Sequence, residues 1–263
     1  MIGIFDSGLG GLTALKEIKK LLPGEDLVYF GDTGRVPYGT RSRETIIKYA
    51  TQDAEFLKGK GVDLIIAACG TVSTNVPLDE LEKKTGVPVI GVVVPAAEAA
   101  VRATKNKKIA VIGTAATVGS GAFEKEIEKL DDTASVTQKA CPLLVPLVEN
   151  GYTARDCEVT RLVLKEYLAP VKESGADTLV LGCTHYPILS EVIADLLPGV
   201  SLISTGAETA RKVASMRNGK AGGKAGEVRY FVSDDPDSFN KNATLFLGEP
   251  LPVKAEKTDV SGI

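Results

Sequence analysis

The segment Gly61-Val-Asp-Leu-Ile-Ile-Ala-Ala-Cys-Gly-Thr71 is matched in the same register by Gly175-Ala-Asp-Thr-Leu-Val-Leu-Gly-Cys-Thr-His185. Each segment has a short apolar run that ends in a cysteine, Cys69 or Cys183, followed by small or polar residues. Such runs are typical of buried strands in a parallel sheet. Because the two cysteines lie 114 residues apart in corresponding positions, we interpret the chain as a duplication of one unit.

The same alternation of strand and helix patterns runs through the rest of the chain. Short apolar runs predict strands at 2–5, 27–30, 64–68, 89–93, 109–112, 178–181, 202–203 and 228–232. Apolar residues at three- and four-residue steps predict helices at 12–22, 43–59, 78–84, 97–104, 122–130, 156–172, 188–197 and 207–217. The segments 2–8 and 109–115 also correspond loosely. The order predicts an α/β fold with two similar units and mainly parallel sheets flanked by helices.

We place the domain boundaries where the second series of strands and helices begins and ends. The first domain is predicted to comprise 1–93 plus 206–263, and the second 94–205. The tail after Gly206 has too few strands for a domain of its own, so we expect it to pack against the first unit. The glycine-rich stretch 218–226 predicts a mobile surface loop.

Composition and charge exclude several classes of function. Thirty-one Lys and Arg against thirty-four Asp and Glu give a formal charge of −3, so we expect no nucleic-acid and no membrane partner. The first residues form no signal peptide, and no apolar stretch reaches the roughly 18 residues of a membrane span, which favours a cytoplasmic protein. Four cysteines in 263 residues are too few for a disulfide scaffold, so their chemistry is that of thiols.

A glycine turn follows the first predicted strand, in Asp6-Ser-Gly-Leu-Gly-Gly11. A dinucleotide loop counted from Gly8 would need Gly or Ala at position 13, where this chain has Thr13, so the turn better fits a small anion at a helix N-terminus. Asp6 is either a helix cap or an active-site carboxylate. After the second strand, the turn Pro37-Tyr-Gly39 lies at the same edge of the sheet and is a candidate wall of a site.

Cys69 and Cys183 are the central candidates. A single cysteine at a strand end is usually a small buried apolar residue, but two in duplicated positions before helix starts favour reactive thiols. Zinc would lack ligands, because the chain has one histidine and no Cys-x-x-Cys pair. His185, two residues after Cys183, could exchange a proton near neutral pH, whereas Glu149 is either an exposed helix-end residue or part of the site.

At these positions the chain resembles glutamate racemases of the cofactor-independent aspartate/glutamate racemase superfamily. The resemblance rests on Asp6-Ser-Gly-Leu-Gly-Gly11, Pro37-Tyr-Gly39, Ala68-Cys-Gly-Thr71, Pro146-Leu-Val-Glu149 and Gly182-Cys-Thr-His-Tyr-Pro187, in the family's order. It implies two facing α/β domains with the active site in the cleft between them. The implied catalytic residues are Cys69, Cys183, Asp6, His185 and Glu149. The implied substrate-binding residues are Asp6, Ser7, Pro37, Tyr38, Gly39, Gly70, Thr71, Thr184 and His185.

The implied reaction is the interconversion of L- and D-glutamate, which would supply D-glutamate for peptidoglycan, cell-wall biogenesis and cell shape. Removing the α-proton on one face and returning one on the other needs two acid–base groups, and two thiols supply them without a metal or any other cofactor. Aspartate racemase is the nearest alternative. A binding module without turnover and a dithiol oxidoreductase remain open as other classes, and so does the oligomeric state, a homodimer included.

One position departs from the family pattern. Many members carry Asn directly after the first cysteine, whereas this chain has Gly70, which offers only its backbone N–H. Either the substrate contact is rearranged around a tolerant position, or the pocket is rebuilt around glycine.

Overall fold

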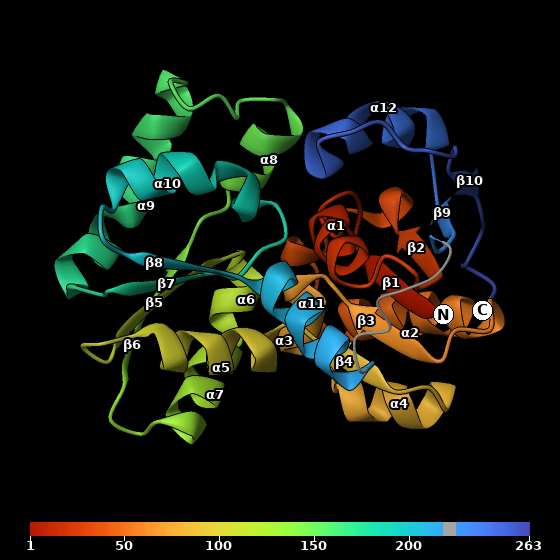
Figure 1. Cartoon of the computed structure of the whole chain (residues 1–263), viewed down its shortest axis with the longest axis horizontal. Helices are drawn as coiled ribbons and strands as arrows, with labels where there is room; N and C mark the ends of the chain where they lie inside the picture. The colour runs from red at the N-terminus through yellow and green to blue at the C-terminus, as the bar shows by residue number, and fades with distance from the viewer. Residues whose placement is uncertain (218–224) are drawn as a thin grey trace.

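The computed structural model describes residues 1–217 and 225–263 and divides their strands between two sheets (Figure 1). The first sheet has the order β10-β9-β2-β1-β3-β4, with strands Glu256–Lys257, Val228–Val232, Leu27–Gly31, Ile2–Asp6, Leu64–Ala67 and Val89–Gly91. The second has the order β6-β5-β7-β8, with strands Ser135–Ala140, Lys108–Gly113, Thr178–Leu181 and Ser201–Ser204. Every strand pairing in this part of the chain is parallel.

Helices cover both sheets. The helices are α1 Leu12–Leu21, α2 Arg43–Gly59, α3 Gly70–Asn75, α4 Leu78–Thr85, α5 Val93–Ala103, α6 Ala115–Gly119, α7 Ala122–Leu130, α8 Leu144–Glu149, α9 Glu158–Ser174, α10 Ser190–Leu196, α11 Thr205–Met216 and α12 Pro236–Leu247. Short 3₁₀ turns are Thr33–Arg35, Tyr38–Thr40 and Tyr186–Leu189. None of the helices in the described ranges is long and apolar enough to cross a membrane.

The central strands of the first sheet are buried on both faces. Ile4 of β1 belongs to the same apolar cluster as Leu15 of α1, whereas the next residue, Phe5, belongs to the cluster of Ala54 in α2. Successive strand residues point to opposite faces, so this alternation places one helix layer on each side. Because both faces of these strands are buried, β1 and β2 are almost continuously apolar in sequence.

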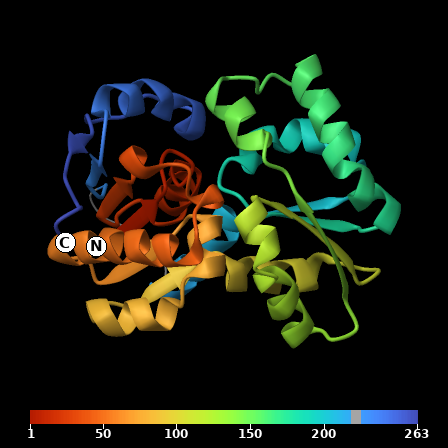
Figure 2. The same ribbon diagram turned by 180° about the vertical axis from the view of Figure 1, so that it is seen from behind.

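The duplication is visible in the sheet topology. The order β2-β1-β3-β4 is repeated as β6-β5-β7-β8, and the register is repeated too: Ile2 pairs with Leu64, and Ile109 pairs with Thr178. The two units lie side by side in both views (Figures 1 and 2), with both chain ends on the first unit. The predicted fold class, an α/β protein of two similar units with parallel sheets, is confirmed.

Several element predictions are wrong. The strand expected at 89–93 ends at Gly91, and α5 begins at Val93, four residues earlier than predicted, because Pro95 is compatible with the first turn of a helix. Strand β6 was not predicted, since it is a partly exposed edge strand with polar residues at several positions. The other elements missed by the pattern are the short strand β10 and the helices α3, α6, α8 and α12.

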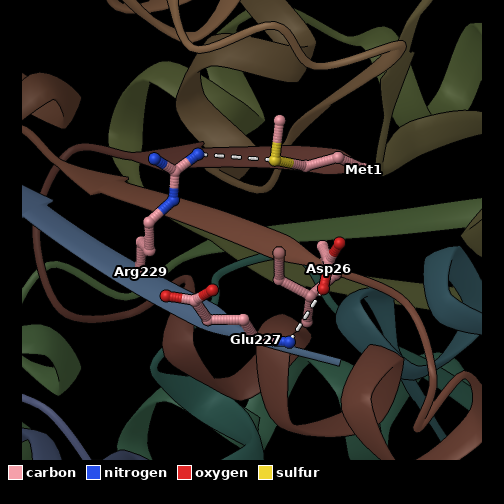
Figure 3. Close-up of a pocket in the computed structure, with 5 residues that line it drawn as sticks. Met1, Asp26, Glu227 and Arg229 are labelled. Carbon is pink, nitrogen blue, oxygen red and sulfur yellow. Dashed lines mark hydrogen bonds between the residues drawn. The ribbon is translucent and has the colours of Figure 1, made fainter. Parts of the chain in front are cut away.

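The tail packs against the first unit, as predicted. Strand β9 pairs with β2, and α12 packs against α1. Where the tail returns, the Glu227 amide donates to Asp26 at 2.9 Å and Arg229 lies 3.5 Å from the sulfur of Met1 (Figure 3). Helix α5 packs mainly against α7, β7 and β8 of the second unit, and it also contacts α11. These contacts support 1–93 plus 206–263 and 94–205 as our proposed domains. Most of the predicted loop, 218–224, lies outside the described residues.

Candidate active site

A cavity of about 320 Å³ lies where the carboxyl ends of the two sheets meet. The sequence-predicted residues that line it are Ser7, Pro37, Tyr38, Gly39, Cys69, Gly70, Thr71, Glu149, Cys183, Thr184 and His185. Further lining residues, which the sequence analysis did not select, are Gly8, Val36, Thr40, Thr114, Ala115, Cys141, Pro142, Val145, Pro146 and Gly182. Segments far apart in the chain therefore form a single pocket between the two units.

Cys69 lies at the first-unit side of the cavity. It follows β3, directly precedes α3, and is only 6% exposed. Its Sγ lies 3.8 Å from the hydroxyl of Ser7. Burial, reinforced by the negative charge of Asp6, raises the pKa of the Cys69 thiol to about 12. This environment favours the thiol over the thiolate at Cys69.

Cys183 lies in the corresponding place after β7, and it has a histidine beside it. The Sγ of Cys183 is 3.9 Å from Nδ1 of His185, and Nε2 of the same ring is 3.0 Å from Oε1 of Glu149. Burial lowers the pKa of His185, but the hydrogen bonds to Cys183 and Glu149 and nearby negative charge outweigh it and raise the pKa to about 10. The three groups form a chain of contacts between the Cys183 thiol and the half-exposed Glu149, with the titratable His185 ring in the middle.

Because of this raised pKa, His185 should stabilise the fold less as pH rises. The folded-state pKa, about 10, exceeds the ordinary 6.5, so the contribution is complete below pH 6.5 and is lost as the pH rises through 10. Chemical denaturation of the wild type and His185→Asn across this pH range measures the contribution of His185 to the free energy of unfolding. The difference in their free energies of unfolding should shrink towards the alkaline end, and a constant or growing difference would contradict the assignment.

Asp6 lies behind the wall of the cavity and is not among the residues that line it. Its carboxylate is 1% exposed and accepts a hydrogen bond of 3.0 Å from the Gly8 amide. Burial raises the pKa of Asp6, while the positive charge of His185 and the amides of Gly8 and Gly11 oppose the shift. The structure thus places Asp6 within electrostatic reach of Cys69, and its role as a substrate ligand stays a prediction.

Thr114 connects the two units at the cavity, and the sequence analysis missed it. It caps α6, and its hydroxyl lies 3.1 Å from that of Thr71 across the cleft. The signal was present: in the loose match between 2–8 and 109–115, Thr114 occupies the position of Ser7. Cys141 also lines the cavity, and burial raises the pKa of its thiol to about 12.

The model of the Asp/Glu/Hydantoin racemase family matches residues 6–213 of the chain. The chain belongs to this family. Glutamate racemase from Geobacter metallireducens is 46% identical over 255 residues, which cover 95% of this chain and 93% of that protein. The prediction of an amino-acid racemase is confirmed at the level of the family.

Solved structures agree with this membership. Glutamate racemase from Francisella tularensis in complex with D-glutamate matches with a TM-score of 0.91 at 35% identity, covering 100% of this chain and 98% of that one. A glutamate racemase isoform from Bacillus anthracis matches with a TM-score of 0.92 at 37% identity, covering 98% of this chain and 97% of that one. The similarity spans both units and therefore the cavity between them.

Proposed function

We propose that this racemase interconverts L- and D-glutamate with two thiols as its acid and base. The observation that carries the proposal is that Cys69 and Cys183, from different sheets, line one cavity. Inverting an α-carbon requires a proton to leave one face and another to arrive on the opposite face, and two thiols on facing domains are suited to both steps. The relatives named above support glutamate as the substrate.

In this proposal each thiol has a partner that accepts or returns its proton. Cys69 has Asp6, whose pKa is raised by burial, and Cys183 has His185 with Glu149 behind it. Ser7, Thr71 and Thr184, with the amides of the loops, can donate hydrogen bonds to the carboxylates and to the developing carbanion. A buried cleft of this kind strengthens such hydrogen bonds because little water competes for them.

Protein dialysed against a chelator and freed of pyridoxal phosphate should still racemise L-glutamate. Loss of optical rotation in deuterated solvent, with deuterium entering the α-position, is the expected result, because protein thiols can carry both proton transfers. L-aspartate tested in parallel decides between the two substrates. Binding without deuterium exchange would favour the binding module, and activity restored only by added metal or cofactor would overturn the two-thiol mechanism.

We further propose a place for this activity in the cell. D-glutamate produced in the cytoplasm would supply peptidoglycan, and through it cell-wall biogenesis and cell shape. The formal charge of −3 is consistent with a small-molecule substrate and gives no field that would hold nucleic acid or an anionic membrane.

A further inference from the structure

A buried cluster of polar side chains lies behind the Tyr38 wall of the cavity. Asp32 follows β2 and Asp53 belongs to α2, and both side chains are 0% exposed. The Tyr38 side chain reaches from the cavity to these carboxyls and is 1% exposed. Arg35, which is partly exposed, closes the cluster. None of these contacts is used by the proton transfers proposed above.

The guanidinium of Arg35 contacts both carboxyls. Its Nε donates to Oδ2 of Asp32 at 2.6 Å, and one terminal nitrogen donates to Oδ1 of Asp53 at 2.8 Å. The other terminal nitrogen donates to the Gln52 side chain at 2.5 Å. The Tyr38 hydroxyl lies within hydrogen-bond distance of Oδ2 of Asp32 and, at 2.9 Å, of Oδ2 of Asp53.

The protons of this cluster do not suffice for two ionised carboxylates. A phenol carries one O–H, so Tyr38 can donate to only one of the carboxyls, and the other contact needs a proton on the carboxyl itself. A single guanidinium also leaves one of two buried negative charges uncompensated, which is costly. The other groups that act on the cluster are Asp6 and Asp259, both acidic, and the Tyr49 ring, which lies 4.2 Å from the Arg35 guanidinium.

We propose that Asp53 is a positioning residue that works as a neutral carboxylic acid. Its O–H, on Oδ2, donates to the Tyr38 oxygen, and the Tyr38 O–H donates to the ionised Asp32, which is paired with Arg35. Burial and the charge of Asp32 raise the pKa of Asp53 well above its usual range, which supports this placement of the proton. The chain of hydrogen bonds holds the turn Tyr38–Thr40 at the cavity.

The position of this turn bears on the reaction because it touches the second unit. A methyl group built on Gly39 would lie 3.1 Å from Cβ of Thr114, so the turn and the second domain are already in close contact. A shift of Tyr38 would change the shape of the substrate cavity that both units form. The kinetic test of this proposal rests on the proposed function, because it needs racemase turnover. The spectroscopic test does not.

The kinetic test uses isosteric replacement. In Asp53→Asn, the amide nitrogen can donate to Tyr38 and the amide oxygen can accept from Arg35, so kcat and KM should stay within about threefold of the wild type. Asp53→Ala leaves Tyr38 and Arg35 without that partner, and KM should rise about tenfold or more. Asp32→Asn removes the required negative charge and should resemble Asp53→Ala. Asp79→Asn, at a carboxylate that is 72% exposed, is the matched control.

A second test does not depend on turnover. The infrared difference spectrum of wild type minus Asp53→Asn at neutral pH should contain one carboxylic-acid C=O band. The C=O band of a protonated Asp6 would cancel, because Asp6 is present in both proteins. Tyr38→Phe should shift that band to higher frequency, because its acceptor is lost. No acid band would overturn the proposal, and tolerance of Asp32→Asn with damage from Asp53→Asn would place the proton on Asp32 instead. An inactive wild type with the band present would contradict only the proposed function.

Discussion

Cys69→Ala and Cys183→Ala should each abolish racemisation while leaving one half of the reaction measurable. Each substitution removes the base for one direction and the acid for the other, so we expect turnover to fall by at least about a thousandfold in both directions. Both thiols are more than nine-tenths buried, and Cys→Ala in such a site removes one atom without adding bulk. The fold should persist, which the thermal unfolding midpoint checks.

The remaining thiol should reveal which enantiomer it faces. The resemblance to the family predicts that Cys69 should take the α-proton of D-glutamate and Cys183 that of L-glutamate. In deuterated solvent, Cys69→Ala should therefore exchange the α-hydrogen of L-glutamate slowly, and Cys183→Ala that of D-glutamate. The reverse preference would overturn the facial assignment but keep the two-thiol mechanism. Near-normal racemisation in either variant would contradict the two-thiol mechanism.

Cys157→Ala is the control for these variants. Cys157 is a free cysteine of intermediate exposure that does not line the cavity. Its replacement should leave racemisation unchanged. Loss of activity there as well would point to a general sensitivity of the fold to cysteine replacement rather than to catalysis.

The parts of the fold that sequence could predict are those whose burial is fixed by local pattern. Strands β3 and β7 are buried at every position, so their apolar runs can be recognised in the sequence. The cysteine after each run then indicates the duplication. Strand β6 could not be recognised in this way. It has a neighbouring strand on one side only, is partly exposed, and carries polar residues that interrupt the apolar pattern. Helices α3, α6 and α8 have five or six residues each, too few for a helical period to be visible.

The contacts of the candidate site also differ in how far the sequence alone predicts them. Cys183 and His185 are neighbours in the chain, so their contact was foreseeable from spacing. The contact between Thr71 and Thr114 depends on how two domains meet, and the contact between Tyr38 and Asp53 depends on how a turn packs on a helix. Neither packing is encoded in a local period, so these partners could be found only in three dimensions.

Gly70 is the position at which the sequence left two interpretations open. Gly70 is the first residue of α3, and a Cβ built on it would lie 2.3 Å from the carbonyl oxygen of Gly182 in the other unit. That oxygen is backbone and cannot rotate away. Any side chain at position 70 must therefore push apart the two strand ends that carry Cys69 and Cys183. The geometry favours a pocket rebuilt around glycine over a merely rearranged contact.

Gly70→Ala should therefore lower kcat/KM about tenfold, and Gly70→Asn about a hundredfold or more, because a displacement of about 1 Å between reacting groups can cost that much. The folded state should survive both changes, since the start of a helix accepts either residue. Gly59→Ala, at a helical glycine with open space around its Cβ position, is the matched control and should leave kcat/KM unchanged. Near-normal activity in a folded Gly70→Asn protein would show that the two units can separate without cost, and the missing asparagine would then be only a rearranged contact.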